Sequence, residues 1–125
     1  MKTKGEIEAE ITEAIVKFEM EYMGRGPKES RTHIIGDMVL VRLQGVLTPA
    51  EQQLTKSADG VELIKRMRSS LIEGARPILF QAVSDIAGVK PVGLHTDIST
   101  VSGERIIVFT LSRDLESALP RKKIP

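Results

Sequence analysis

The 125-residue sequence predicts a single α+β domain in the order α-ββ-α-α-ββ. Two observations predict this class. Apolar residues recur at helical spacing in residues 5–23 and again in residues 58–87. Between and after these segments, short runs rich in β-formers come in pairs joined by turn residues. We therefore expect two β-hairpins that form a four-stranded antiparallel sheet, packed by an N-terminal amphipathic helix and a long central helix.

The N-terminal helix is predicted over residues 5–23. Its two faces consist of the apolar residues Ile7, Ile11, Ala14, Ile15, Phe18 and Tyr22 and of the charged residues Glu6, Glu10, Glu13, Lys17 and Glu21. Gly24 suits the left-handed position after a helix end, and Pro27 cannot continue the helix.

The first hairpin is predicted from residues 31–35 and 38–43, which Gly36 and Asp37 separate. The sequence Thr48-Pro49-Ala50-Glu51 follows, with a threonine at the N-cap, a proline at the first helical position and a glutamate that closes a capping box. A short helix from there to about Ser57 is expected.

The central segment, residues 58–87, carries an apolar stripe that contains Gly74 and Pro77. We expect one long helix with a kink, or two helices that share an axis. Thirty helical residues span about 45 Å, which is long for a domain of this size. A homodimer built along this helix or along a shared sheet edge is the expected solution.

The second hairpin is predicted from residues 91–99 and 104–111, joined by residues 100–103. The two hairpins can pair within one chain or between two chains. Residues 114–125 are predicted to be a mobile tail with a basic end.

Composition excludes several functions. The net charge of +1 gives no general attraction for nucleic acid. With only four aromatic residues, the chain also lacks the rings that a stacking platform for single-stranded nucleic acid needs. The absence of cysteine removes disulfides and cysteine-based metal sites. No apolar run has the length of a signal peptide or of a membrane span, so we expect a cytoplasmic protein without direct membrane insertion.

The stretch Gly24-Arg25-Gly26-Pro27-Lys28 has two interpretations. A phosphate-binding loop follows a strand and opens a helix, whereas this one follows a helix and precedes a strand. A weaker anion site remains open, with Gly24 and Gly26 allowing close backbone approach and Arg25, Lys28 and Arg31 supplying positive charge. The alternative is a helix stop with solvated charges.

The two histidines, His33 and His95, fall in different predicted hairpins, and Asp97 shares a strand face with His95. If the hairpins pair suitably, these three residues could form a metal site or a proton relay. In the alternative, each histidine is a strand residue that hydrogen-bonds to a neighbouring residue, and Asp97 pairs with Arg105 across the hairpin. Lys65, Arg66 and Arg68 form a basic stretch that could contact acidic lipid head groups or an acidic partner, but a solvated face is the preferred interpretation. No catalytic motif and no cofactor is predicted.

Several motifs resemble the MpsC-like family. They are Tyr22-Met23-Gly24-Arg25-Gly26-Pro27, the Gly36-Asp37 turn, Leu47-Thr48-Pro49-Ala50-Glu51 and His95-Thr96-Asp97-Ile98-Ser99, within a match from about Lys4 to Leu111. The family name refers to a sodium-translocating, membrane-potential-generating system. There the MpsC-type protein is the small soluble member beside a membrane ion-transporter subunit and a large partner. The resemblance supplies no reaction and no catalytic residues.

Three functions follow from these observations. The resemblance implies a non-enzymatic accessory subunit, associated with cation or bicarbonate transport and peripheral to the membrane through a partner. The residues also fit an anion-binding module that uses the loop at Arg25, or a metal protein or enzyme that uses His33, His95 and Asp97. We expect the first, as a homodimer.

Overall fold

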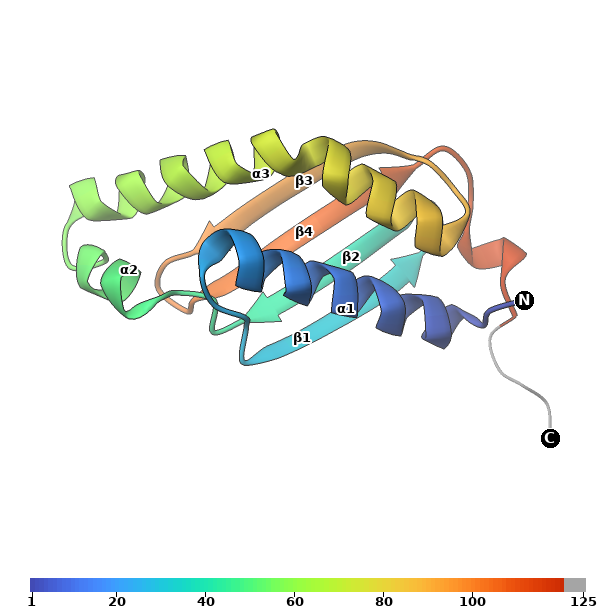
Figure 1. Ribbon diagram of the computed structural model, residues 1–125, viewed down its shortest axis with the longest axis horizontal. Coiled ribbons are helices and arrows are strands. Elements are labelled where there is room, and N and C mark those ends of the chain that lie inside the picture. Colours follow the sequence, from blue (N-terminus) through green and yellow to red (C-terminus); the bar gives the residue numbers. More distant parts are fainter. Residues whose placement is uncertain (121–125) are drawn as a thin grey trace.

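The computed structural model describes residues 1–120 and confirms the predicted order of elements (Figure 1). The elements are α1 (Lys4–Met23), β1 (Glu29–Ile35), β2 (Met38–Gln44), α2 (Pro49–Leu54), α3 (Ala58–Ala87), β3 (Pro91–Ser99), β4 (Glu104–Leu111) and a short 3₁₀ turn, η1 (Glu116–Ala118). None of the helices within residues 1–120 combines the length and the apolar character that crossing a bilayer requires.

The four strands form one antiparallel sheet in the order β1-β2-β4-β3. The two hairpins therefore pair within a single chain, through β2 and β4, with Val41 opposite Ile107. Both α1 and α3 lie on the same side of the sheet, α1 along β1 and α3 towards β3 (Figure 1). The fold thus has two layers, one of helices and one of strands.

The core lies between these two layers. The strands β1, β2 and β4 bury alternate side chains against the helices, as in β4, where Ile107, Phe109 and Leu111 are all buried, whereas the edge strand β3 buries only Pro91 and Ile98. The helices contribute residues from one stripe each: Ile7, Ile11, Ile15 and Phe18 from α1 and Ile64, Ile72, Ala75, Leu79 and Val83 from α3. The amphipathic patterns of the sequence therefore pack as predicted.

The central segment is one continuous helix of 30 residues that runs through Pro77. The alternative of two separate helices is wrong. The short helix before it ends at Leu54 rather than near Ser57, because Ser57 caps the next helix: its Oγ accepts a hydrogen bond from the Gly60 N–H at 3.0 Å.

Part of the segment assigned to the tail packs on the body of the protein. Leu115 is buried in the core, and the Gly36 N–H donates to Glu116 Oε1 at 2.9 Å. The Lys4 N–H donates to the carbonyl oxygen of Pro120 at 2.9 Å, which ties the N-terminus to the same region. The rest of that prediction, residues 121–125, lies outside the described residues.

Candidate functional site

Within residues 1–120, no helix or strand covers the face of the sheet that lies opposite the helices (Figure 1). Strand alternation and register place on it the side chains of Arg31, His33, Ile35, Met38, Leu40, Arg42, His95, Asp97, Ile106, Val108 and Thr110, and at one end those of Glu29, Gln44, Ser99 and Glu104. We call this set the open face. Ile35 is 47% exposed and Met38 is 37% exposed, while Leu40, Ile106 and Val108 are half-buried. Apolar side chains thus occupy the middle of a solvent-facing sheet.

The open face separates the predicted metal residues. His33, Leu40, Val108 and His95 form one row across the four strands. Three strand spacings place the two histidine backbones about 14 Å apart, on opposite edge strands. Asp97 lies near His95, and Lys65 Nζ approaches its Oδ1 at 3.8 Å. Within residues 1–120, no group of three His, Cys, Asp or Glu side chains is arranged to hold a metal ion.

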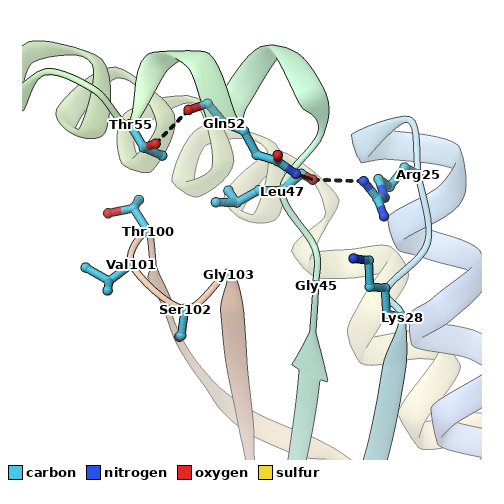
Figure 2. Close-up of a pocket in the computed structure, with 10 residues that line it drawn as sticks. All are labelled: Arg25, Lys28, Gly45, Leu47, Gln52, Thr55, Thr100, Val101, Ser102 and Gly103. Atoms are coloured by element: carbon cyan, nitrogen blue, oxygen red, sulfur yellow. Dashed lines mark hydrogen bonds between the residues drawn. The ribbon is translucent and has the colours of Figure 1, made fainter.

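The loop at Arg25 borders a pocket of about 420 Å³ (Figure 2). Its walls come from four segments: the α1–β1 loop, the β2–α2 connection, α2 and the β3–β4 turn. The polar side chains that line it are Arg25, Lys28, Gln52, Thr55, Thr100 and Ser102. We call this the Arg25 pocket. It brings together two of the predicted anion-binding residues, Arg25 and Lys28.

The other predicted members do not reach the Arg25 pocket. Gly24 takes the left-handed conformation that ends α1, with φ +86°, as its position after the helix predicts. Gly26 packs near the side chain of Met20, where an added Cβ would come 3.1 Å from Met20 Cγ. Arg31 lies on the open face and lines a smaller hollow with Arg42 and Gln44.

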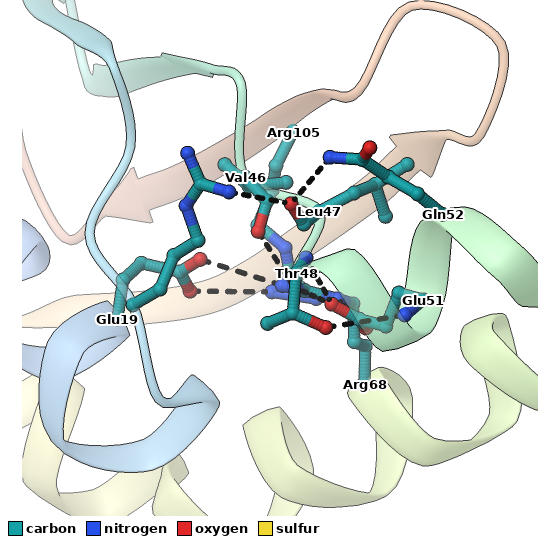
Figure 3. A network of polar contacts seen from close by, with 9 residues as sticks. Glu19, Val46, Leu47, Thr48, Glu51, Gln52, Arg68 and Arg105 are labelled. Carbon is teal, nitrogen blue, oxygen red and sulfur yellow. Dashed lines mark hydrogen bonds and ion pairs between the residues drawn. The ribbon is translucent and has the colours of Figure 1, made fainter.

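A buried cluster of charges lies behind the wall of the pocket (Figure 3). It contains Glu19 of α1, Glu51 of α2, Arg68 of α3 and Arg105 of β4, each at most 4% exposed. We call it the buried quartet. Arg68 donates from Nε and Nη2 to the two carboxylate oxygens of Glu51, at 2.7 and 2.8 Å, and from Nη2 to the Val46 carbonyl at 3.0 Å. Since each member comes from a different element, the quartet joins all three α-helices to the sheet.

The contacts of Glu19 within the quartet are longer than those of Glu51. Arg68 Nη1 lies 3.4 Å from Glu19 Oε1, and Arg105 Nη1 lies 4.0 Å from Glu19 Oε2. Among the described residues, Glu19 Oε2 and the Nε and Nη1 of Arg105 are buried without a hydrogen-bond partner. Such groups are costly to bury, so this half of the quartet is held mainly by charge attraction.

Burial and charge act differently on the two carboxyl groups. Burial raises the pKa of Glu19 above its ordinary value of 4.5, against the opposing charges of Arg105 and Arg68. For Glu51 burial acts in the same direction, but hydrogen bonds from Arg68 and from the Thr48 N–H outweigh it. The pKa of Glu51 therefore lies below 4.5. Glu51 is accordingly held as a carboxylate, which matches its paired hydrogen bonds from Arg68.

Sequence reasoning missed the quartet, although a signal was present. Glu19 follows Ile15 by four residues, and Arg68 stands four residues from both Ile64 and Ile72, so both charges fall on apolar helix stripes. Arg105 occupies a core-facing position of β4, two residues before Ile107. The interpretation of Arg68 as part of a solvated face was wrong, because its side chain is 1% exposed.

A comparison with protein-family models matches residues 3–113 to MpsC, described as a Na⁺-translocating membrane potential-generating system. The chain belongs to the MpsC family. The match includes the whole sheet, the three α-helices and every residue of the buried quartet and the Arg25 pocket.

Two relatives from Bacillus subtilis (strain 168) are similar over most of their length. The uncharacterized protein YbcI is 42% identical over 120 residues, which cover 96% of this chain and 97% of YbcI. The uncharacterized protein YrhF is 27% identical over 108 residues, covering 86% of this chain and 88% of YrhF. No solved structure gives a significant match. The family membership confirms the resemblance seen in the sequence, and the description of the family points to a component of a membrane-potential-generating system.

Proposed function

We propose that this MpsC-family protein is a non-enzymatic cytoplasmic subunit of a membrane-potential-generating system, and that it acts as a homodimer docked on the system's membrane ion-transporter subunit. The transport is of cations or of bicarbonate. The family description supports the system. The open face is the structural observation that carries the proposal, because a sheet with helices on one side leaves an apolar surface that an assembly would cover.

The occupant we propose for the open face is a second copy of the chain. Arg31 and Asp97 lie in one row of the sheet, at opposite edges. A two-fold axis parallel to the strands, with the open faces in contact, places β1 of one copy over β3 of the other. Arg31 of each copy then faces Asp97 of the other, and Leu40 faces Val108. The edge charges and the row of Leu40 and Val108 are thus complementary, whereas Arg42 of each copy lies opposite Ile106 of the other.

The size of the open face fits a modest dimer. Four strands at about 4.8 Å spacing and seven residues at about 3.4 Å rise give a footprint of about 450 Å² per copy. Two copies together cover about 900 Å², at the lower end of specific interfaces. We therefore expect a dimer that dissociates on dilution.

The test uses a host strain from which the gene for this chain has been deleted. We expect this strain to show a reduced Na⁺- or bicarbonate-dependent membrane potential, measured with a potential-sensitive dye, and wild-type protein to restore it. Leu40→Glu places a charge in the middle of the open face and should fail to restore it. Leu63→Glu is the matched control, since Leu63 is an exposed leucine on α3, 52% accessible.

The proposal also requires physical association. Wild-type protein should copurify with an ion-transporter subunit identified by mass spectrometry in the membrane fraction. The Leu40→Glu variant should not, because in the proposal the homodimer is the form that docks. An unchanged membrane potential in the deletion strain, or equal rescue by Leu40→Glu and wild type, would contradict the proposal.

A further inference from the structure

We propose that the Arg25 pocket binds a phosphate group, carried by a small phosphorylated molecule or present as free phosphate. This site is separate from the open face. It goes beyond the docking function, since neither the family description nor the relatives' names assign a ligand.

The charge of the lining favours an anion. Arg25 and Lys28 both line the pocket, and the lining contains no aspartate or glutamate. Lys28 forms no hydrogen bond or ion pair through its ammonium group with any residue in the part of the chain that the structure describes. Two positive side chains without a carboxylate between them create a local positive field that a phosphate dianion would neutralise.

Both positive side chains are held in place from behind. Arg25 Nη1 donates to the Leu47 carbonyl at 3.1 Å, and Gln52 Nε2 donates to the same oxygen at 3.2 Å. Among residues 1–120, no other hydrogen bond engages the Arg25 guanidinium, which leaves its remaining N–H donors available to a ligand. The stem of Lys28 packs over Gly45, where an added Cβ would lie 2.8 Å from Lys28 Cγ. Gly45 also has a φ of +68°, a backbone conformation that favours glycine. The absence of a Cβ at Gly45 therefore allows both this turn of the backbone and the packing of the Lys28 stem over it.

Neutral donors stand across the pocket from the two cations. Figure 2 shows Thr100 and Ser102 on the β3–β4 turn, across the pocket from Arg25 and Lys28, with their hydroxyl groups turned away from the two cations, so that a rotation about χ1 is needed to aim them at a ligand. Hydroxyl groups can donate to phosphate oxygens. The buried quartet fixes the wall between these groups, because Arg68 binds the Val46 carbonyl and Glu51 accepts a hydrogen bond from the Thr48 N–H at 2.9 Å. The site is therefore formed before a ligand arrives, which lowers the cost of binding.

The volume of about 420 Å³ indicates a ligand larger than phosphate alone. It falls within the range of about 300–1,000 Å³ that is usual for small-molecule pockets. A phosphorylated sugar or a molecule of similar size would place its phosphate between Arg25 and Lys28 and extend towards α2.

Isothermal titration calorimetry on the purified full chain tests the proposal with three probes: inorganic phosphate, ribose 5-phosphate and ribose. We expect saturable binding of at least one phosphate-bearing probe and none of ribose. Binding of both phosphate probes with equal affinity assigns free phosphate, while binding of ribose 5-phosphate alone assigns a phosphorylated small molecule. Absence of saturable binding by either phosphate probe at about 1 mM, in low salt, would overturn the proposal.

Lys28→Met provides the decisive variant because it removes the ammonium and keeps the stem over Gly45. It should weaken phosphate binding about tenfold or more and leave the unfolding temperature unchanged. Lys17→Met, which removes an exposed charge from α1, is the matched control and should bind as wild type does. Equal affinity of Lys28→Met and wild type would refute the site. Leu40→Glu should retain binding, so that failure of the docking function and failure of this site are distinguishable.

Discussion

Arg68 is the residue on which the polar interior depends. Its guanidinium holds both carboxylate oxygens of Glu51 and reaches Glu19 and the Val46 carbonyl. A buried arginine is tolerated only when its donors are satisfied and its charge is neutralised, and the two glutamates meet both conditions. The pair of Glu51 and Arg68 also links the capping box of α2 to α3.

Replacing this arginine should destabilise the protein strongly. Arg68→Met keeps an apolar stem of similar length but leaves Glu51 and Glu19 buried without their cation. We expect the free energy of unfolding in urea to fall by about 3–5 kcal/mol. Arg66→Met is the matched control, because the Arg66 side chain is 71% exposed and, within the described part of the chain, pairs with Glu62 alone, one turn earlier. It should change stability by less than about 0.5 kcal/mol. Similar losses in both variants would contradict the assigned role of Arg68.

The pKa of Glu51 predicts how stability depends on pH. Its value lies below 4.5 in the folded protein, so the unfolded chain binds a proton at higher pH than the folded chain does. The stabilisation is fully present above 4.5 and is lost as pH falls through the lower folded value. Glu51→Gln should therefore lose less stability than wild type when the pH is lowered below 4.5, measured by urea unfolding at a series of pH values. An equally steep acid loss in wild type and variant would rule out Glu51 as the source.

At the scale of elements, the close contact between α2 and α3 depends on a glycine. Gly60 is buried in the first turn of α3, and a Cβ at this position would collide with the Leu54 carbonyl oxygen at the end of α2. Backbone atoms cannot move aside as a flexible side chain can. Gly74, in the same helix, has no atom within 4 Å of an added Cβ. The two glycines of α3 therefore have opposite consequences when replaced.

We expect Gly60→Ala to destabilise the protein by about 1–3 kcal/mol, as overpacking does. Gly74→Ala should stabilise it by about 0.5–1 kcal/mol, because alanine loses less conformational freedom in a helix. Thermal unfolding followed by circular dichroism measures both. A stabilised Gly60→Ala would mean that α2 does not pack against the start of α3 as described.

The elements were predictable because their signals are local. The period of apolar residues marks α1 and α3, and turn residues such as Gly36 and Asp37 mark the hairpins, so their bounds differ little from those expected. The Arg25 pocket was predictable in part, since Arg25 and Lys28 adjoin a helix stop. Gln52, Thr100 and Ser102 come from distant segments that only the fold brings to it. The buried quartet could not be predicted for the same reason: its members come from distant segments, and the burial of Arg105 depends on which face of β4 the helices cover.

At the scale of the whole molecule, the two-layer architecture explains why an assembly is expected. Both α-helices that pack on the sheet lie on one side of it, and no other element of residues 1–120 covers the open face (Figure 1). Leu40, Ile106 and Val108 form the apolar centre of this face, with Arg31 and Asp97 at its edges. In the dimer that we propose, a second copy related by a two-fold axis would cover the apolar centre and pair the edge charges.

Sedimentation equilibrium of the purified chain tests this arrangement most directly. Wild-type protein should fit a monomer–dimer equilibrium. Arg31→Glu and Asp97→Arg should each shift it towards monomer, because each places like charges opposite one another across the two-fold axis. The double variant restores opposite charges and should restore the dimer. A monomer at all concentrations, or a dimer equally stable in all four proteins, would contradict the account.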